Sequence, residues 1–250
     1  MINRIIEIAV AAGEAILEVY NNPDISADVD YKADDSPLTK ADLAANAIIV
    51  EELKKLEPQY PILSEEEKHQ SYETRKGWDT FWLVDPLDGT KEFINRNGEF
   101  TVNIALIKQG KPVLGVIYVP VKDITYWAKE NKAFKIVNGK STQLSVNNAM
   151  GNRIAVRSKS HASEEEEVVL NRYDVTDSIS VGSSLKFCMV AEGRADIYYR
   201  HGPTMEWDTG AGQAIVQGAG GKVYKGADES EVFSYNKENL LNGSFLCLGF

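Results

Sequence analysis

Apolar side chains recur at helical spacing over the start of the chain. Ile5, Ala9, Gly13 and Ile16 share one face, with charged residues between them. This period of about 3.6 residues predicts an amphipathic helix over residues 1–20. The chain is therefore expected to open on a helix that packs one face against a core.

A second helix is expected to begin after Thr39. Thr39 suits the N-cap position, and Asp42, three residues on, is the partner of a loose capping box. The apolar face continues until Pro58, which cannot extend a helix. The polar stretch 21–37 between the two helices is rich in Asn, Asp and Pro, and predicts a loop or an irregular strand.

Short apolar runs follow the second helix. Residues 60–64 and 81–84 predict buried strands, and the segments 100–120 and 125–140 each hold two runs about a polar turn, which is typical of hairpins. Pro86 is expected to end the strand before it, because it lacks an amide proton and restricts the preceding residue. The first part of the chain therefore predicts two helices packed on an antiparallel sheet.

The rhythm of the pattern changes after residue 148. Strands are expected over 153–158, 178–183, 195–200 and 221–224, and helices over 162–173, 184–193 and 208–220. Such alternation is typical of α/β units. We expect an α+β or α/β protein whose lobes, residues 1–148 and 149–250, form one compact unit. Of Tyr198 and Tyr199, one is expected to face the core and the other the surface.

Composition excludes several classes of protein. A chain of 250 residues with 43% apolar residues can bury a core without disulfides. Arg4 and Glu7 interrupt the first apolar segment, so it is neither a signal peptide nor a membrane span. Cys188 and Cys247 fall in an apolar helix pattern and an apolar strand pattern, which indicates buried thiols and a reducing cytoplasm. Peripheral attachment to the inner face of the cell membrane stays open.

The charge balance bears on the partner. A net charge of −10 argues against a nucleic-acid polymer, which is usually met by clustered Lys and Arg. A small phosphorylated ligand remains compatible with this charge, because a bound metal ion can invert the local charge.

Carboxylates gather at the ends of predicted elements. They are Asp42, Glu65 to Glu67, Asp85, Asp88 and Asp208. Burying like charges together is costly unless a cation lies between them. Hard divalent cations such as Mg²⁺ prefer oxygen ligands. Taken together, these acids predict a magnesium site.

The segment DPLDGT carries the sharpest part of this pattern. A turn at Pro86 and Leu87 directs Asp85 and Asp88 toward one point and exposes the Leu87 carbonyl as a further ligand. Gly89 then permits close approach of the backbone to a ligand. Each motif also has a plain reading: DPLDG as a simple turn, SEEE as a solvated loop, and EWDTGAG as a helix capped by its Asp.

Whole stretches of the sequence resemble a known family. LSEEE, WLVDPLDGTKEF and EWDTGAGQAIVQGAGG are similar to the three motifs of the inositol monophosphatase superfamily, which are lithium-sensitive, Mg²⁺-dependent phosphomonoesterases. KADDSPLTKAD, SKSHAS and VGSSLKFCMVAEGRADIYYR resemble the 3′(2′),5′-bisphosphate nucleotidases, and in particular their bacterial CysQ group. The resemblance runs over nearly the whole chain. It implies a layered αβαβα sandwich and a monomer or homodimer.

The resemblance also implies roles for individual residues. The metal ligands would be Glu65, Asp85, Leu87 through its carbonyl, Asp88 and Asp208, holding two or three Mg²⁺ ions, and no ligand position departs from the family pattern. Thr90 would bind the attacking water, with Asp42 behind it and Glu65 as the third catalytic residue. The substrate would be contacted by Glu65, Leu87, Asp88, Gly89, Thr90, His161, Ser183, Lys186, Arg200 and Asp208.

For each candidate substrate contact in the second lobe, an ordinary structural role is also open. His161 could be an ordinary loop residue, and Ser183 a helix cap. Lys186 and Arg200 would ordinarily be solvated charges. The resemblance favours contact with a nucleotide.

The function that the resemblance implies is hydrolysis of the 3′-phosphate of adenosine 3′,5′-bisphosphate, with the 3′-phosphorylated sulfate donor as a second candidate substrate. Two alternatives stay open. One is a phosphatase for inositol monophosphate or a sugar bisphosphate, which would share every metal ligand. The other is a catalytically silent sensor that binds a nucleotide or a metal.

Overall fold

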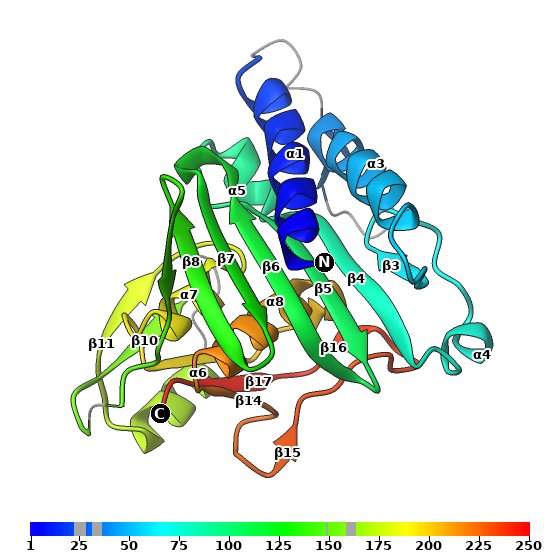
Figure 1. Ribbon diagram of the computed structural model, residues 1–250. Coiled ribbons are helices and arrows are strands. Elements are labelled where there is room, and N and C mark those ends of the chain that lie inside the picture. The colour runs from blue at the N-terminus through cyan, green and yellow to red at the C-terminus, as the bar shows by residue number, and fades with distance from the viewer. Residues whose placement is uncertain (23–28, 32–36, 149, 159–163) are drawn as a thin grey trace.

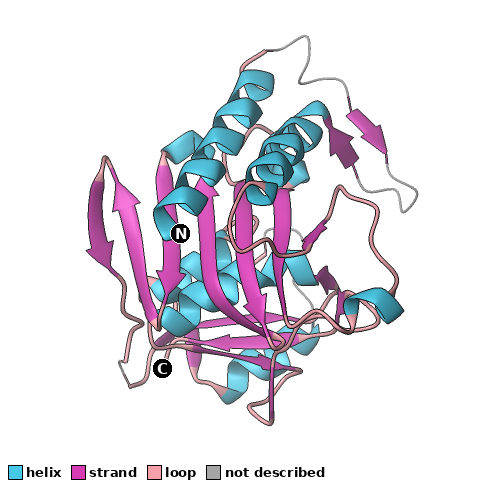
Figure 2. Cartoon of the chain, turned by 45° about the vertical axis from the view of Figure 1, so that its right-hand side comes forward, coloured by secondary structure: helices cyan, strands magenta, loops and turns pink. Residues whose placement is uncertain are grey.

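Helical and β layers alternate through the molecule (Figures 1 and 2). The computed structural model describes residues 1–22, 29–31, 37–148, 150–158 and 164–250. The first layer holds α1 (Ile2–Tyr20) and α3 (Lys40–Lys54), which lie side by side on one face of a large sheet. Both predicted helices are confirmed.

The start of α3 is fixed as its sequence predicts. The backbone N–H of Thr39 donates to Asp42 Oδ2 at 2.8 Å, and the N–H of Ala41 donates to Thr39 Oγ1 at 3.2 Å. These bonds satisfy backbone groups that a helix start otherwise leaves without partners. Asp42 is consequently held in one orientation.

The large sheet has seven strands in chain order: β3 (Ile62–Ser64), β4 (Thr80–Asp88), β5 (Thr101–Lys108), β6 (Lys111–Val119), β7 (Ile124–Lys129), β8 (Lys132–Val137) and β9 (Lys140–Gln143). Trp82 and Val84 of β4 pack with α1 and α3, whereas Phe81 and Leu83 face the opposite layer. Both predicted hairpins are confirmed. The expectation of a wholly antiparallel sheet was wrong at one edge, where β3 runs parallel to β4.

Pro86 does not end β4, contrary to the sequence-based expectation. The strand continues to Asp88, and its register shifts so that Asp85 pairs with Asn103 and Asp88 with Thr101. Pro86 and Leu87 therefore lie opposite the single residue 102, as in a β-bulge. A bulge leaves its extra residue outside the ladder, so the missing N–H of proline costs no hydrogen bond there.

The middle layer consists of α7 (Leu185–Ala191) and α8 (Glu206–Gly218), which lie between the two sheets. Helix α8 comes very close to β6 at Gly115. A Cβ on Gly115 would stand 2.6 Å from the carbonyl oxygen of Ala211. Only glycine fits this contact, which fixes the depth of α8 against the large sheet.

The second sheet has the order β11 (Val175–Ser180), β10 (Arg153–Arg157), β12 (Ile197–Arg200), β17 (Phe245–Leu248), β14 (Lys222–Lys225) and β15 (Glu231–Val232). Strand β10 is parallel to both neighbours, and the later pairs are antiparallel. Helix α6 (Glu164–Arg172) packs on its outer face. The result is the αβαβα sandwich that the family resemblance implied.

Because helices cover both faces of this sheet, Tyr198 and Tyr199 are both buried. The expectation that one of them faces the surface was wrong. Cys188 in α7 and Cys247 in β17 are buried thiols, as predicted. The change from the first sheet to the second falls between β9 and β10, close to the predicted lobe boundary. That boundary stays a prediction, because α8 packs on the first sheet.

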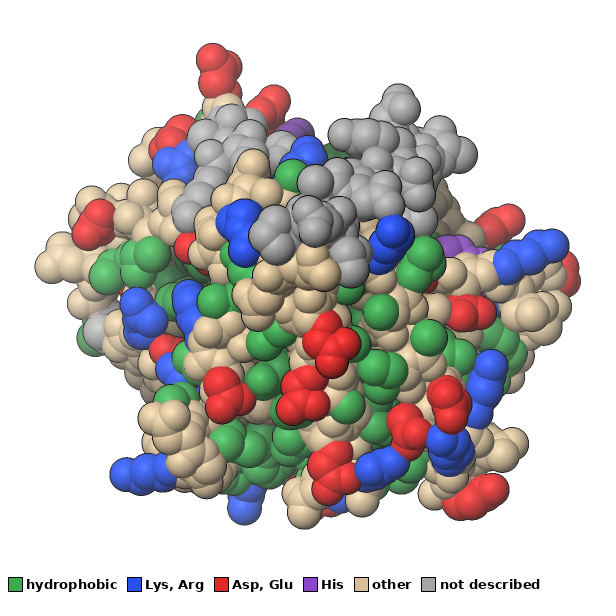
Figure 3. Space-filling model, turned by 90° about the horizontal axis from the view of Figure 1, so that it is seen from above, with side chains coloured by type: hydrophobic (Ala, Val, Ile, Leu, Met, Phe, Trp, Pro, Cys, Tyr) green, Lys and Arg blue, Asp and Glu red, His purple; other side chains and the backbone are tan. Residues whose placement is uncertain are grey.

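The remaining elements are short: β1 (Val29–Tyr31), β2 (Pro37–Thr39), α4 (Tyr72–Arg75), α5 (Thr90–Ile94), the 3₁₀ helix η1 (Pro120–Lys122), β13 (Thr204–Met205) and β16 (Leu241–Asn242). In the part of the chain that the structure describes, no helix has the length and apolar character needed to cross a bilayer. Seen from above, the Lys and Arg side chains of the described residues are scattered among Asp and Glu (Figure 3).

Candidate active site and metal centre

Three carboxylates from distant segments converge at one end of the large sheet. Glu65, Asp85 and Asp208 each offer an oxygen, and these oxygens all lie within 4.8 Å of one another. Glu65 directly follows β3, and its N–H donates to the carbonyl of Val84 in β4 at 3.1 Å. This bond continues the parallel pairing and brings Glu65 beside Asp85. Asp208 arrives from the first turn of α8.

The aspartates are anchored through one oxygen each. Asp85 Oδ1 accepts the N–H of Leu87 at 3.1 Å, and Asp208 Oδ2 accepts the N–H of Met205 at 2.8 Å. Asp88 Oδ2 accepts the hydroxyl of Ser184 at 2.5 Å. Within the described residues, the second oxygen of each aspartate accepts no protein hydrogen bond. Each carboxylate thus has one oxygen held by the chain and one available to an ion.

The electrostatics of the cluster call for a cation. Asp85 is 2% exposed, and burial, followed by the nearby charges of Glu65 and Asp88, raises its pKa well above the ordinary range. Burial and the charge of Asp88 likewise raise the pKa of Asp208, although the Met205 hydrogen bond opposes the shift. Buried carboxylates that repel one another are stabilised when a metal ion takes the place of protons.

The donor set fits Mg²⁺. The cluster offers carboxylate oxygens, and neither Cys nor His belongs to it in the described part of the chain. Oxygen-only sites favour hard cations, whereas thiolate and imidazole ligands favour zinc and other transition metals. Glu65, Asp85 and Asp208 are therefore the residues best placed to hold such an ion, with Asp88 beside them.

Thr90 and Asp42 meet next to this cluster. Thr90 Oγ1 donates to Asp42 Oδ1 at 3.5 Å, while Asp42 Oδ2 accepts from the backbone and the hydroxyl of Thr39. Thr90 is the first residue of α5 and follows Gly89, whose φ of 94° lies in the left-handed region. Glycine is favoured there because a side chain would be strained.

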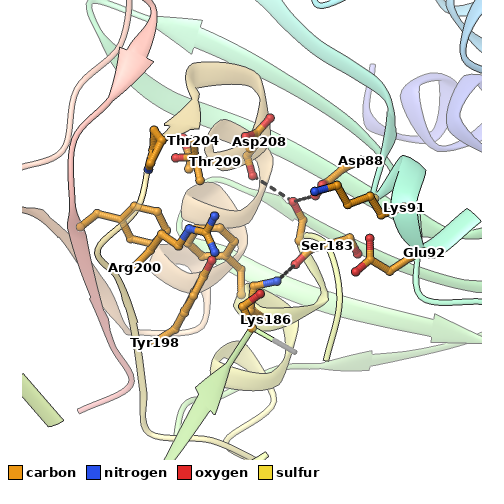
Figure 4. A pocket seen from close by; sticks show the side chains of 16 residues that line it. Asp88, Lys91, Glu92, Ser183, Lys186, Tyr198, Arg200, Thr204, Asp208 and Thr209 are labelled. Carbon is orange, nitrogen blue, oxygen red and sulfur yellow. Dashed lines mark hydrogen bonds between the residues drawn. The ribbon is translucent and has the colours of Figure 1, made fainter. Parts of the chain in front are cut away.

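A cavity of about 170 Å³ adjoins the acids. Asp88 and Asp208 lie on one side of it, and Lys186 and Arg200 lie on the other (Figure 4). Ser183 and Tyr198 also line it. Lys91 and Glu92 line it as well, so carboxylates and cations face one cavity. With metal ions at the acids, this cavity would suit a ligand that carries more than one phosphate.

Lys186 is not the solvated charge that its residue type suggests. It is 6% exposed, and its Nζ donates to the Ser183 carbonyl at 2.7 Å. Burial lowers its pKa to about 8, against the opposing attraction of Asp88. Arg200 is half-buried, and its Nε donates to the carbonyl of Gly202 at 3.3 Å.

Ser183 precedes α7 but is not the residue next to the helix. Ser184 holds that N-cap position, although Ser183 Oγ accepts a long bond of 3.5 Å from the N–H of Leu185. A ligand contact for Ser183 stays a prediction. His161, the remaining candidate contact, lies outside the described residues.

Comparison with known sequences shows the family to which this chain is similar. The profile of the inositol monophosphatase family matches residues 1–246. The chain belongs to the inositol monophosphatase family. It is 47% identical over 248 residues to the 3′(2′),5′-bisphosphate nucleotidase CysQ of Salmonella typhimurium, covering 98% of each chain. It is 46% identical over 246 residues to CysQ of Escherichia coli K12, also covering 98% of each.

A solved structure agrees with these relatives. The crystal structure of CysQ from Bacteroides thetaiotaomicron, a bacterial member of the inositol monophosphatase family, superposes with a TM-score of 0.86 at 45% identity. The match covers 99% of this chain and 97% of that one. The resemblance inferred from the motifs is therefore confirmed, together with the fold class.

Two polar residues at the site were not singled out by sequence reasoning about the family motifs. Ser184 bonds Asp88, and Asn103 Nδ2 donates to Ser184 Oγ at 2.9 Å and to Asp88 Oδ2 at 3.3 Å. Asn103 stands in the otherwise apolar run of β5, and β5 is the antiparallel partner of β4. The side-chain amide of Asn103, in a strand that pairs with DPLDG, is the sequence feature that could have identified it as a site residue.

Proposed function

We propose that this chain removes the 3′-phosphate of adenosine 3′,5′-bisphosphate, giving AMP and inorganic phosphate. The observation that carries the proposal is the cavity that joins an acidic, cation-requiring cluster to the buried Lys186 and the half-buried Arg200. The relatives of 46 and 47% identity are themselves 3′(2′),5′-bisphosphate nucleotidases. The reaction consumes one water, whose oxygen joins phosphorus while the P–O bond to the ribose breaks.

Magnesium is the proposed cofactor, in two or three ions. Glu65, Asp85 and Asp208 would hold it, with Asp88 and the Leu87 carbonyl as further ligands. When bound, such ions lower the pKa of a water and stabilise the departing oxygen. Four carboxylates contribute about −4 and the ions about +4 to +6, so the phosphate would meet a neutral or positive site despite the acidic chain.

Thr90 and Asp42 are proposed to position the attacking water. Because the Thr90 hydroxyl donates its proton to Asp42, its oxygen lone pairs accept a hydrogen bond from a water. Asp42 is itself held by Thr39, so the hydroxyl keeps one orientation. The water proton would pass through Thr90 toward Asp42 as the O–P bond forms, with the amides of Gly89 and Thr90 on the phosphate oxygens.

The second phosphate is proposed to bind at Lys186, Arg200 and Ser183. A buried ammonium is costly without a counter-charge, and a phosphate dianion supplies one. A ligand with a single phosphate uses the acidic end alone and gains nothing from these cations. This argument favours a bisphosphorylated nucleotide over inositol monophosphate.

A substrate panel tests the proposal. Phosphate release is measured with adenosine 3′,5′-bisphosphate, its 3′-phosphorylated sulfate-donor analogue, inositol 1-phosphate and a sugar bisphosphate, each with Mg²⁺ and with EDTA. We expect the highest kcat/KM for the adenosine bisphosphate and no release in EDTA. A thousandfold preference for inositol phosphate would overturn the substrate assignment, and tight binding without turnover at saturating Mg²⁺ would indicate a sensor.

We propose a monomer or homodimer that works in the cytoplasm, with or without peripheral contact with the membrane. Light scattering and cell fractionation test these two points.

A further inference from the structure

One hydroxyl links the acidic cluster to the helix that carries the substrate-facing lysine. Ser184 is 2% exposed and precedes α7 directly. Its Oγ lies 2.5 Å from Asp88 Oδ2, 2.9 Å from the carbonyl oxygen of Asp208 and 2.9 Å from Asn103 Nδ2. Ser184 thus contacts β4, α8 and β5 at once. Ser183 and Lys186, its neighbours in sequence, face the cavity (Figure 4).

The donors and acceptors of this network can be assigned. Thr101 Oγ1 donates to Asn103 Oδ1 at 3.0 Å, which leaves the Asn103 amide nitrogen as the group that faces Ser184. Since that amide donates to the Ser184 oxygen, the hydroxyl proton must go to Asp88 or to the Asp208 carbonyl. The carboxylate is the stronger acceptor and the nearer one, so the proton goes to Asp88.

Asp88 Oδ2 consequently has two donors, Ser184 and the longer bond of 3.3 Å from Asn103. A carboxylate oxygen whose two lone pairs both accept hydrogen bonds is a poor ligand for a metal ion. Asp88 can therefore offer an ion only Oδ1, as a monodentate ligand. Mg²⁺ requires near-octahedral geometry and prefers such single oxygens, whereas Ca²⁺ accepts bidentate carboxylates at longer distances.

We propose that Ser184 is a positioning residue that makes Asp88 a monodentate ligand and so favours Mg²⁺ over Ca²⁺. The proposal rests on the metal site proposed above. It extends that site by a residue that lines the same cavity and acts on the ion through its hydrogen bond to Asp88. It also makes the metal site sensitive to the position of α7, because the residue that orients Asp88 lies next to the residues that face the substrate.

The experiment compares cation binding by the wild type, Ser184→Ala and Ser183→Ala in the absence of substrate. Isothermal titration calorimetry of EDTA-treated protein gives the Kd of Mg²⁺ and of Ca²⁺, and thermal melts report folding. For Ser184→Ala we expect Mg²⁺ binding to weaken about tenfold or more, the usual effect of losing a partner of a metal ligand. Ca²⁺ binding should weaken less, so the Mg²⁺/Ca²⁺ ratio shifts toward Ca²⁺.

Ser183→Ala is the matched control, since it makes the same chemical change one residue away and has no bond to Asp88. Its Mg²⁺ Kd should equal that of the wild type. An equal loss for both cations in Ser184→Ala, accompanied by a lower melting temperature, would show a purely structural role and overturn the proposal. An unchanged Mg²⁺ Kd would also overturn it.

Asn103→Ala provides a second route if Ser184→Ala does not fold. It removes the amide that directs the Ser184 proton to Asp88, so we expect a smaller shift of the Mg²⁺/Ca²⁺ ratio in the same direction. A ratio equal to that of the wild type counts against the proposal. If the wild type binds neither cation, the proposed metal site is wrong and this inference is wrong with it. If the wild type binds Mg²⁺ but the Mg²⁺/Ca²⁺ ratio is the same in the variants, only this inference is wrong.

Discussion

Thr90 Oγ1 donates to Asp42 Oδ1 at 3.5 Å, and the other oxygen of Asp42 is held by the Thr39 backbone at 2.8 Å. The same carboxylate therefore caps α3 and faces the hydroxyl at the start of α5. A capping box that builds a helix also orients a candidate catalytic pair. Substitutions at Thr90 separate these two roles, because Thr90 takes no part in the cap.

Thr90→Val keeps the shape of the side chain and removes its hydroxyl. We expect kcat for phosphate release to fall about 10²-fold or more, the range typical of a lost general acid–base group. The Mg²⁺ Kd should not change, because Thr90 is not among the acids. Thr90→Ser restores the hydroxyl and should recover kcat to within about tenfold. Wild-type kcat in Thr90→Val would contradict the assigned role.

Asp85→Asn should abolish turnover and yet stabilise the metal-free protein. The substitution removes one of several like charges from a site where Asp85 is 2% exposed. In EDTA, the melting temperature of the variant should exceed that of the wild type by a few degrees, since about 1 kcal/mol corresponds to roughly 2–4 °C at this chain length. Calorimetry in EDTA and in Mg²⁺ measures both states.

Glu67→Gln is the control for this substitution. Glu67 accepts the Asn46 side-chain amide at 2.8 Å and lies outside the carboxylate cluster. The variant should keep its activity and should not gain stability in EDTA. A melting temperature for Asp85→Asn at or below that of the wild type in EDTA would argue against charge repulsion at the cluster.

The effect of metal removal should depend on pH. Burial and neighbouring acids raise the pKa of Asp85 and Asp208, so the folded metal-free protein binds more protons than the unfolded chain between the ordinary and the raised values. The free energy of unfolding in EDTA therefore falls as the pH rises through that range. Mg²⁺ binds the deprotonated acids, so the difference in melting temperature between Mg²⁺ and EDTA should grow from pH 5 to pH 7.5. A constant difference would contradict this.

Substrate affinity should depend on the charge of Lys186. Its pKa is lowered to about 8, while phosphate monoesters are already dianions above pH 7. We expect KM for adenosine 3′,5′-bisphosphate to rise above pH 8 as the ammonium loses its proton. Lys186→Arg keeps its charge and should remove this inflection. KM values that are flat to pH 9 in the wild type would count against a phosphate contact.

The same pKa has a separate effect on stability. The unfolded Lys186 titrates near 10.5 and the folded one near 8, so between these values the unfolded chain binds more protons. Stability from this group therefore rises with pH across that window. Weaker substrate binding and a more stable protein above pH 8 would together identify Lys186.

Local patterns were sufficient to predict most of the fold. Helical spacing gave α1, the capping box gave the start of α3, and alternating runs gave both hairpins. The prediction that the strand ends at Pro86 was wrong. A β-bulge that accommodates a proline depends on the partner strand and leaves no signal in its own sequence. The parallel pairing of β3 with β4 is likewise a long-range choice that local pattern does not determine.

The acids of the site were predicted by residue type and by family resemblance, but their convergence was not derivable from spacing. Glu65 and Asp208 are 143 positions apart in the sequence and meet only because α8 is placed between the sheets. The burial of Lys186 escaped prediction for the same reason. Its surroundings are built from β12 and the loop before α7, and lysine alone suggests exposure.

The ion pair between Lys237 and Glu206 should contribute measurably to stability. Glu206 is the first residue of α8 and 0% exposed, and Lys237 Nζ donates to it at 2.6 Å. Lys237→Met leaves a buried carboxylate that retains two backbone N–H bonds, so we expect a loss of about 2 kcal/mol, below the range for a wholly unpaired charge. Lys225→Met breaks the exposed pair with Glu231 and should cost under about 1 kcal/mol. Urea unfolding measures both variants, and equal losses would show that burial does not strengthen the first pair.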